Sequence, residues 1–138
     1  MTDPAALTAL RRRYPGAETF TFGDGPDLCA RLLTLVRNGQ KTASTGALRD
    51  YDNGDPLPVP GRCDIALHWD GRPAFVIETQ QVITCPFHQV TEAMALAEGE
   101  NADLTGWRRD HIAFFTRNGG FDPDMQVVWE RFKMIQVC

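Results

Sequence analysis

The sequence lacks the features that assign a protein to several well-known classes. No apolar run approaches the roughly 20 residues that cross a bilayer, and the segment after Met1 has neither the basic nor the apolar region of a signal peptide. The P-loop pattern G-x-x-x-x-G-K-S/T, the dinucleotide pattern G-x-G-x-x-G, the zinc-protease pattern H-E-x-x-H and the hydrolase pattern G-x-S-x-G are also absent. We therefore expect a cytoplasmic protein with no membrane partner and with none of these standard sites.

Cysteine is too sparse and too scattered to form a disulfide scaffold or a zinc site. The 4 cysteines, Cys29, Cys63, Cys85 and Cys138, include no C-x-x-C pair. Disulfide scaffolds are rich in cysteine, and zinc sites need ligands in local pairs, so we interpret all of them as reduced thiols. Cys29 falls among apolar residues of a predicted helix, which favours a role in core packing.

Net charge argues against a general affinity for nucleic acid. The chain of 138 residues has a formal charge of -4, with 43% hydrophobic and 23% charged residues. This length fits one domain, 1–138, that buries a hydrophobic core without metal or disulfides. Residues 1–49 are nevertheless basic, and the run Arg11 to Arg13 is more typical of a solvated helix end than of a binding patch.

The spacing of apolar residues predicts a mixed domain. Asp3 and Pro4 open a helix as N-cap and first residue, Asp103 caps a later helix, and Gly39 suits the left-handed position after a helix. The pattern predicts helices over 4–13, 26–38, 88–97 and 104–118, and strands over 18–22, 41–46, 62–69, 73–84 and 125–137, with a long loop at 50–61. We expect an α+β fold in which helices surround a mostly antiparallel sheet or small barrel.

One segment places a lysine beside three hydroxyl groups at a helix-to-strand junction. The run from Gly39 to Thr45 reads Gly-Gln-Lys-Thr-Ala-Ser-Thr. An ammonium beside hydroxyls can hold a phosphate or an anionic intermediate, or act as a base toward a hydroxyl. Lys41 and Ser44 share a pocket only if the backbone turns between them, because residues three apart on a strand face opposite sides. A solvated lysine and an ordinary strand serine are the alternative.

Three carboxylates lie within six residues at a predicted junction between helices. Glu98, Glu100 and Asp103 are close enough for like charges to raise a pKa, as a general acid or base requires, and carboxylates also suit Mg²⁺ or Mn²⁺. The alternative is that Asp103 is an N-cap and that both glutamates stabilise the next helix N-terminus. For Asp103 we favour the cap, and for Glu100 both interpretations stay open.

The helix after Asp103 carries an aromatic and basic group. Trp107 and His111 are four residues apart on one face, and Arg108 is adjacent, so the group can stack a nucleobase and contact a phosphate. Core packing of Trp107 is the more common outcome for such a residue. Glu78, within the apolar strand 73–84, is a further candidate if its side chain faces inward.

Taken together, these segments resemble the ASCH domain proteins, which are related to the PUA RNA-binding fold. The resemblance runs from about Phe22 to Val137 and is closest to the longer bacterial stand-alone members. It is carried by Phe22-Gly23-Asp24, Lys41-Thr42-Ala43-Ser44, Pro60-Gly61, Val76-Ile77-Glu78-Thr79, Pro86-Phe87 and, most specifically, Glu98-Gly99-Glu100-Asn101-Ala102-Asp103 before Trp107-Arg108, His111 and Phe114-Phe115. It implies a small PUA-like β-barrel flanked by helices, with a cleft that binds RNA or nucleotides.

The resemblance also implies roles for single residues. Short relatives that hydrolyse N4-acylated cytidines use a lysine, a threonine and a glutamate, which correspond to Lys41, Ser44 and Glu100. Longer relatives are linked to metal-dependent ribonuclease activity. Ser44 in place of threonine, and Gly46 in place of an arginine, are departures that bear on substrate specificity rather than on the fold.

We therefore predict a hydrolase of nucleosides, nucleotides or RNA. Lys41 activates Ser44 or a water molecule, and Glu100 transfers the proton to the leaving group. We expect no cofactor, unless the protein is a nuclease that uses Mg²⁺ or Mn²⁺. A non-catalytic RNA-binding module and a metal-dependent ribonuclease with carboxylate ligands are the alternatives. The expected substrate-binding residues are Thr42, Thr45, Glu78, Glu98, Trp107, Arg108 and His111.

Overall fold

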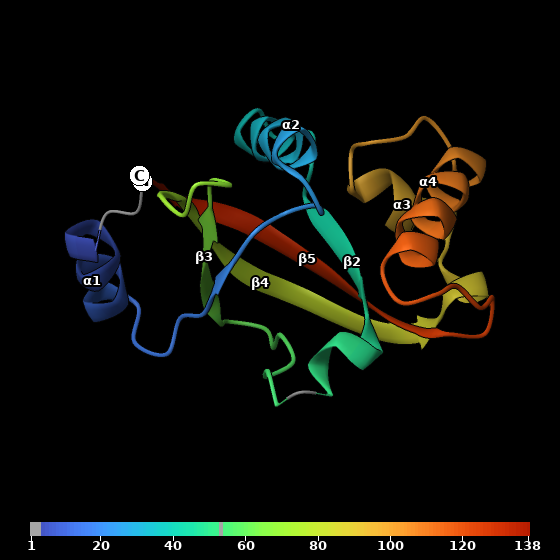
Figure 1. The fold of residues 1–138 in the computed structure, drawn as a ribbon, viewed down its shortest axis with the longest axis horizontal. Helices are drawn as coiled ribbons and strands as arrows, with labels where there is room; N and C mark the ends of the chain where they lie inside the picture. Colours follow the sequence, from blue (N-terminus) through green and yellow to red (C-terminus); the bar gives the residue numbers. More distant parts are fainter. Residues whose placement is uncertain (1–3, 53) are drawn as a thin grey trace.

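A five-stranded mixed sheet forms the centre of the protein (Figure 1). The structure is a computed structural model, and it describes residues 4–52 and 54–138. The strand order is β1-β3-β4-β5-β2, and every neighbouring pair is antiparallel except β1 and β3. The strands are β1 (Thr19–Phe20), β2 (Ala43–Ala47), β3 (Cys63–Leu67), β4 (Pro73–Pro86) and β5 (Gln126–Val137). The predicted cap Asp3 lies outside the described residues.

Four helices pack around this sheet and confirm the α+β class. They are α1 (Pro4–Arg13), α2 (Pro26–Arg37), α3 (Glu92–Ala97) and α4 (Leu104–Arg117), and two short 3-10 turns, η1 (Leu48–Tyr51) and η2 (Phe87–Gln89), join the set. In Figure 1, α1 lies at one end of the sheet near the C-terminus, α2 lies above it, and α3 and α4 lie together at the other end. No helix of the described chain is both long and apolar enough for a membrane span.

Barrel closure, which the resemblance implied, is not observed. Within the described ranges no ladder joins β1 to β2, so the sheet remains open at these two edges. The physical reason lies in the predicted strand 18–22, of which only Thr19 and Phe20 pair with β3 before the chain bends toward α2. A strand of two residues cannot offer a second ladder along its other edge.

The core has three parts, and β5 contributes to both faces of the sheet. Helix α2 packs its buried stripe, which includes Cys29, against Phe75, Ile77 and Phe132. Helices α3 and α4 cover Trp129 on the opposite face of β5, and α1 covers Ile65 and Val76. The predictions of core packing for Cys29 and of burial on both faces of the last strand are therefore confirmed.

The predicted helix over 88–97 is wrong in its first half. A 3-10 turn occupies 87–89, Val90 is extended with ψ 125, and Thr91 caps a shorter helix by accepting a 3.2 Å hydrogen bond from the Met94 amide. Phe87 is held next to the start of β5, because its amide donates to the Met125 carbonyl at 2.8 Å. The chain therefore follows the sheet for several residues before a helix begins.

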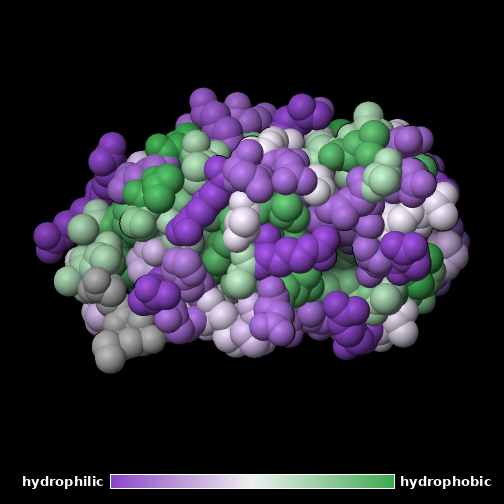
Figure 2. Space-filling view, turned by 90° about the horizontal axis from the view of Figure 1, so that it is seen from above, coloured by the Kyte–Doolittle hydropathy of each residue, from purple (hydrophilic) through white to green (hydrophobic). Residues whose placement is uncertain are grey.

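The surface seen from above has no broad hydrophobic face. Figure 2 shows hydrophobic residues dispersed among hydrophilic ones over this side of the molecule. Large exposed hydrophobic side chains do occur singly in the described chain, for example Trp69 in the β3–β4 turn. Scattered apolar residues of this kind are normal for a folded domain and do not indicate an interface.

Candidate functional site

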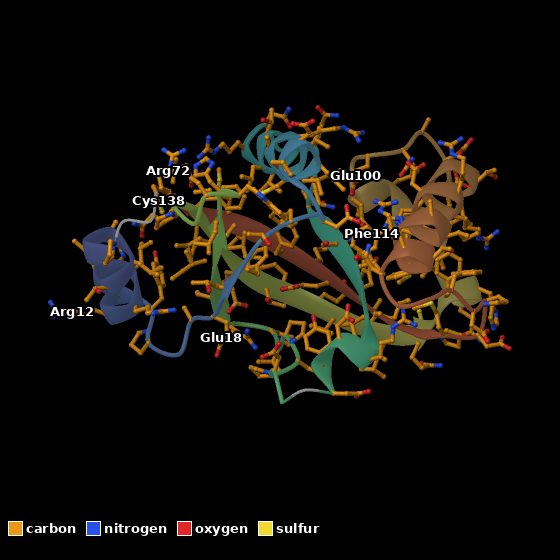
Figure 3. All side chains as sticks on the ribbon, in the orientation of Figure 1. Arg12, Glu18, Arg72, Glu100, Phe114 and Cys138 are labelled. Carbon is orange, nitrogen blue, oxygen red and sulfur yellow. The ribbon has the colours of Figure 1, made fainter. Side chains whose placement is uncertain are left out.

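A cavity of about 650 Å³ lies in front of β4 and β5, between the two open edges of the sheet. Its walls come from β1, α2, β2, the loop after η1, β5 and α4. Figure 3 shows three of the lining residues, Glu18, Glu100 and Phe114, on widely separated segments around it. The volume is in the range of small-molecule sites, which are typically about 300–1,000 Å³.

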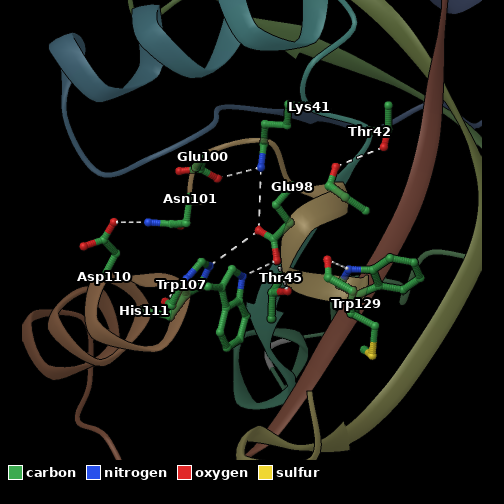
Figure 4. Close-up of polar contacts among 12 residues, drawn as sticks. Lys41, Thr42, Thr45, Glu98, Glu100, Asn101, Trp107, Asp110, His111 and Trp129 are labelled. Carbon is green, nitrogen blue, oxygen red and sulfur yellow. Dashed lines mark hydrogen bonds and ion pairs between the residues drawn. The ribbon is translucent and has the colours of Figure 1, made fainter. Parts of the chain in front are cut away.

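Lys41 reaches this cavity because α2 ends where the sequence predicts. Gly39 takes the left-handed conformation at φ 83, and the Lys41 amide then donates to the Leu35 carbonyl at 3.0 Å. The residue is only 2% exposed, and its Nζ lies 2.8 Å from Glu100 Oε2 and 3.6 Å from Glu98 Oε1 (Figure 4). A buried ammonium thus faces two carboxylates, in the manner of a charge network that is costly to break.

Glu98 is the centre of a buried polar network (Figure 4). Its Oε2 accepts hydrogen bonds from Thr45 Oγ1 and from Trp107 Nε1, both at 2.7 Å, and its Oε1 lies 3.5 Å from His111 Nε2. Burial alone would raise the pKa of Glu98, but the His111 hydrogen bond and the Lys41 charge outweigh burial and lower this pKa. Glu98 is therefore an ionised anchor whose donors fix the surrounding side chains.

His111 lies between two acceptors and is best satisfied as a cation. Its Nδ1 is 2.9 Å from the Trp107 carbonyl and its Nε2 faces Glu98, whereas a neutral imidazole has only one N–H to donate. Burial would lower the pKa of His111, but the hydrogen bond and charge of Glu98 outweigh it and raise this pKa. The ring also stacks on Trp107, with centroids 4.1 Å apart.

Stability should consequently fall as the pH rises through the folded-state pKa of His111. A group whose pKa is raised by folding stabilises the native state below its unfolded pKa, near 6.5, and loses that contribution at higher pH. Urea unfolding between about pH 6 and 9 should show this decline, and His111→Gln should flatten it. If the free energy of unfolding changes with pH equally in the two proteins, His111 does not carry the charge inferred here.

Gly99 brings the two acidic residues against the Lys41 segment. It is left-handed at φ 72, and the neighbouring chain is tied to β2 because the Thr42 amide donates to the Ala97 carbonyl at 2.9 Å. A Cβ on Gly99 would overlap the backbone carbonyl of Gln40. The close approach of two backbones, rather than any side-chain contact, therefore places Glu98 and Glu100 beside Lys41.

Gly99→Ala should destabilise the protein more than Gly39→Ala does. Both glycines have positive φ, where alanine costs about 1–2 kcal/mol, but the space around Gly39 is open to 4 Å. The overlap at Gly99 should add about 1–3 kcal/mol of overpacking, measured as the free energy of unfolding in urea. If both variants lose the same stability, the backbone approach does not constrain the site.

The structure brings together five of the predicted site residues and places Ser44 on the same cavity wall. Thr45, Glu98, Glu100 and His111 surround Lys41, and all of these line the cavity. Thr45, not Ser44, contacts this cluster through Glu98. Ser44 also lines the cavity and is directly opposite Glu130 in the β2–β5 ladder, whereas Thr45 is opposite Trp129.

Four other predicted substrate contacts do not line the cavity. Thr42 donates to the Ala97 carbonyl at 3.0 Å, so its hydroxyl joins β2 to the end of α3. Trp107 is 0% exposed and stacks between Phe87 and the His111 ring, so no base can lie on it. Arg108 and Glu78 are not among the lining residues, and Glu78 accepts a 2.9 Å hydrogen bond from Gln80 instead.

A second polar group in the cavity was missed by sequence reasoning. Glu130 faces the cavity from β5, and its Oε2 accepts a hydrogen bond from the Thr79 hydroxyl. Nearby, Arg62 holds Asp64 through a 2.9 Å ion pair, and Tyr51 completes this wall. The one signal in the sequence is an isolated acid, Glu130, on a strand whose neighbouring same-face residues are apolar.

Metal ligation by the predicted carboxylates is not supported by their partners. Glu98 already receives hydrogen bonds from two neutral donors and faces two cationic groups, and Glu78 lies away from it. Among the residues that the structure describes, no group of three or more His, Cys, Asp or Glu is arranged to hold a metal ion. The carboxylate of Glu98 is therefore bound by hydrogen-bond donors and cations of the protein itself.

The fold and the cavity define a class of protein: an α+β domain with an open mixed sheet and a cavity lined by a buried lysine–carboxylate cluster. A sequence model of the ASCH domain matches residues 18–136. The chain belongs to the ASCH domain family, and the resemblance inferred from its motifs is confirmed.

Solved structures agree with this assignment. The ASCH domain from Lactobacillus crispatus JV V101 is 29% identical with a TM-score of 0.81, and the match covers 93% of this chain and 85% of that one. A protein from Enterococcus faecalis V583 is 28% identical with a TM-score of 0.82, over 96% and 87% of the two chains. The ASCH protein from Zymomonas mobilis, 9% identical with a TM-score of 0.52 over 88% and 71%, shares the fold alone. No curated protein sequence matches the chain.

Proposed function

We propose that this protein is a hydrolase of nucleosides, nucleotides or RNA that acts in the cavity beside Lys41. The observation that carries the proposal is the buried Lys41 ammonium, 2.8 Å from Glu100, on the wall of a cavity of about 650 Å³. Membership of the ASCH domain family points to a ligand related to nucleic acid, and the cavity has room for one nucleoside unit. Short relatives that act on N4-acylated cytidines make that class of nucleoside the first to test.

In the proposed reaction, Lys41 and its neighbours activate a nucleophile and stabilise negative charge. Lys41 first passes a proton to Glu100, with which it is in direct contact, and the resulting neutral amine removes the proton from Ser44 or from a water molecule. The resulting ammonium faces the site of the developing oxyanion, where a fixed charge in a partly dry cavity is most effective. Glu98 holds Lys41, Thr45 and His111 in place and takes no part in proton transfer.

The experiment is an analysis of products by mass spectrometry. The pure protein is incubated with N4-acetylcytidine and with a mixed RNA, with and without EDTA. We expect deacetylated cytidine or shortened RNA at the same rate in both conditions, because the chemistry assigned to Lys41 needs no metal. Salt-sensitive binding of RNA without any product would instead favour a binding module. Loss of activity in EDTA would favour the metal-dependent nuclease.

A further inference from the structure

The cavity contains two carboxylates in opposite environments. Glu100 accepts a hydrogen bond from the Lys41 cation at 2.8 Å, so its Oε2 is occupied as an acceptor. Glu130 faces the same cavity from the middle of β5, where the residues on either side of it along that face, Val128 and Phe132, are apolar. Carboxyl groups placed in different environments within one site can take different acid and base roles.

The contacts of Glu130 leave one oxygen available to a ligand. Thr79 donates its hydroxyl to Oε2, whereas Oε1 has no hydrogen-bond partner in the described part of the chain. Ser44, the candidate nucleophile, is directly opposite Glu130 on the neighbouring strand, and antiparallel partners of this kind have Cβ atoms about 4.5–5.5 Å apart. A substrate that contacts Ser44 therefore also lies beside Oε1 of Glu130.

The electrostatic surroundings of Glu130 favour its protonated form. The pKa of Glu130 is raised, mainly because the side chain is buried. The Asp64 charge raises it further, and the Thr79 hydrogen bond and the Arg62 charge offset only part of this increase. Arg62 is itself paired with Asp64 at 2.9 Å, and the Tyr51 hydroxyl and the carboxyl groups of Asp50 and Asp55 are further titratable groups on the cavity wall. A raised pKa leaves a larger fraction of a carboxyl group protonated at a given pH, as a general acid requires.

We infer that Glu130 is a further catalytic residue, the general acid that protonates the leaving group in the proposed hydrolysis. When the bond from the electrophilic centre to the leaving nitrogen or oxygen breaks, the leaving atom keeps the electron pair and takes the proton of Glu130. Glu130 becomes a carboxylate and regains a proton from solvent, which receives the one removed from the nucleophile. This role rests on the proposed function and replaces the sequence-based expectation that Glu100 protonates the leaving group.

The test compares two substrates that differ in their need for a proton. The amine of N4-acetylcytidine must be protonated as it leaves, whereas the nitrophenolate of 4-nitrophenyl acetate leaves without a proton. Glu130→Gln keeps the size of the side chain and the acceptor for Thr79, but it has no proton to transfer. It should slow N4-acetylcytidine hydrolysis by about 100-fold or more, while hydrolysis of 4-nitrophenyl acetate stays close to the wild-type rate.

The pH dependence supplies a second readout that a structural role would not change. Wild-type kcat for N4-acetylcytidine should fall as the pH rises through the pKa of Glu130, and this alkaline limb should be absent in Glu130→Gln. Thr79→Val removes the hydrogen bond that lowers this pKa and should move the limb to higher pH. Glu92→Gln, an exposed glutamate on α3 that does not line the cavity, is the matched control and should leave both rates and the limb unchanged.

The outcomes separate this inference from the function on which it rests. Equal losses of Glu130→Gln on both substrates, or an alkaline limb that persists in it, would overturn the role of Glu130 while leaving an active hydrolase. If the wild-type protein turns over neither of these substrates and leaves RNA intact as well, the proposed function and this role fail together. The role of Glu130 would also be overturned if Glu130→Gln hydrolyses N4-acetylcytidine at the wild-type rate and both proteins show the alkaline limb.

Discussion

Replacing Lys41 by methionine is expected to abolish turnover of any substrate that the cavity hydrolyses. Methionine preserves much of the length of the side chain but removes the amine that activates the nucleophile and faces the developing oxyanion. General-base catalysis contributes about 10²–10⁴-fold and loss of a charge-stabilising donor about 10²–10³-fold, so activity should fall below detection. The measurement is the rate of product formation by mass spectrometry or chromatography at saturating N4-acetylcytidine.

Loss of the cation also removes the shared partner of Glu98 and Glu100, so stability must be measured separately from activity. Lys41→Arg keeps a positive charge between the carboxylates but cannot act as a base at neutral pH. It should unfold at a urea midpoint near that of the wild type and still be inactive. Lys133→Met, at a lysine whose side chain is 61% exposed on β5, is the matched surface control and should remain active. Full activity in Lys41→Met would show that the chemistry assigned to Lys41 is wrong.

Replacing Glu98 by alanine should produce the largest loss of stability of any substitution in the site. The change leaves Trp107 Nε1 and Thr45 Oγ1 without their acceptor and removes one of the two carboxylates that face the buried Lys41. Removal of one partner from a buried ionic network costs about 3–5 kcal/mol. Urea unfolding should show the midpoint decrease with an unchanged slope, because the area exposed on unfolding is nearly the same.

The same network predicts an acid limit to the stability that Glu98 provides. Its pKa is lowered in the folded state, so its contribution is present above its unfolded value, near 4.3, and is lost as the pH falls through the folded pKa. Glu92→Ala, at an exposed position on α3, should change stability by no more than about 0.5 kcal/mol. An equal effect of Glu98→Ala and Glu92→Ala would mean that the buried network does not stabilise the protein.

Local sequence signals predicted the elements that deliver Lys41 to the cavity. Gly39 ends α2 in the left-handed conformation, and Asp103 caps α4 by accepting a 2.8 Å hydrogen bond from the Gly106 amide. These features depend on the chemistry of a few adjacent residues, so they can be recognised without a structure. The convergence of Lys41 with Glu100 was also expected, but only from the order of motifs in a known family.

What the sequence could not supply were the contacts between distant segments. Whether Ser44 or Thr45 meets Glu98 depends on the facing of β2, which is set by its register with β5. Glu130 was overlooked because side chains along a strand alternate between its two faces, and only tertiary packing decides which face turns toward the cavity. Barrel closure is not observed for a related reason, since β1 pairs with β3 over only two residues before the chain bends toward α2.

The most direct test of the account is a crystal structure of the wild-type protein with cytidine bound. We expect cytidine in the cavity between Lys41 and Glu130, with a polar atom within hydrogen-bond distance of the Lys41 Nζ or the Glu100 carboxylate. Cytidine bound elsewhere on the molecule, or an empty cavity at a cytidine concentration that saturates binding in solution, would contradict the assignment of this cavity as the site.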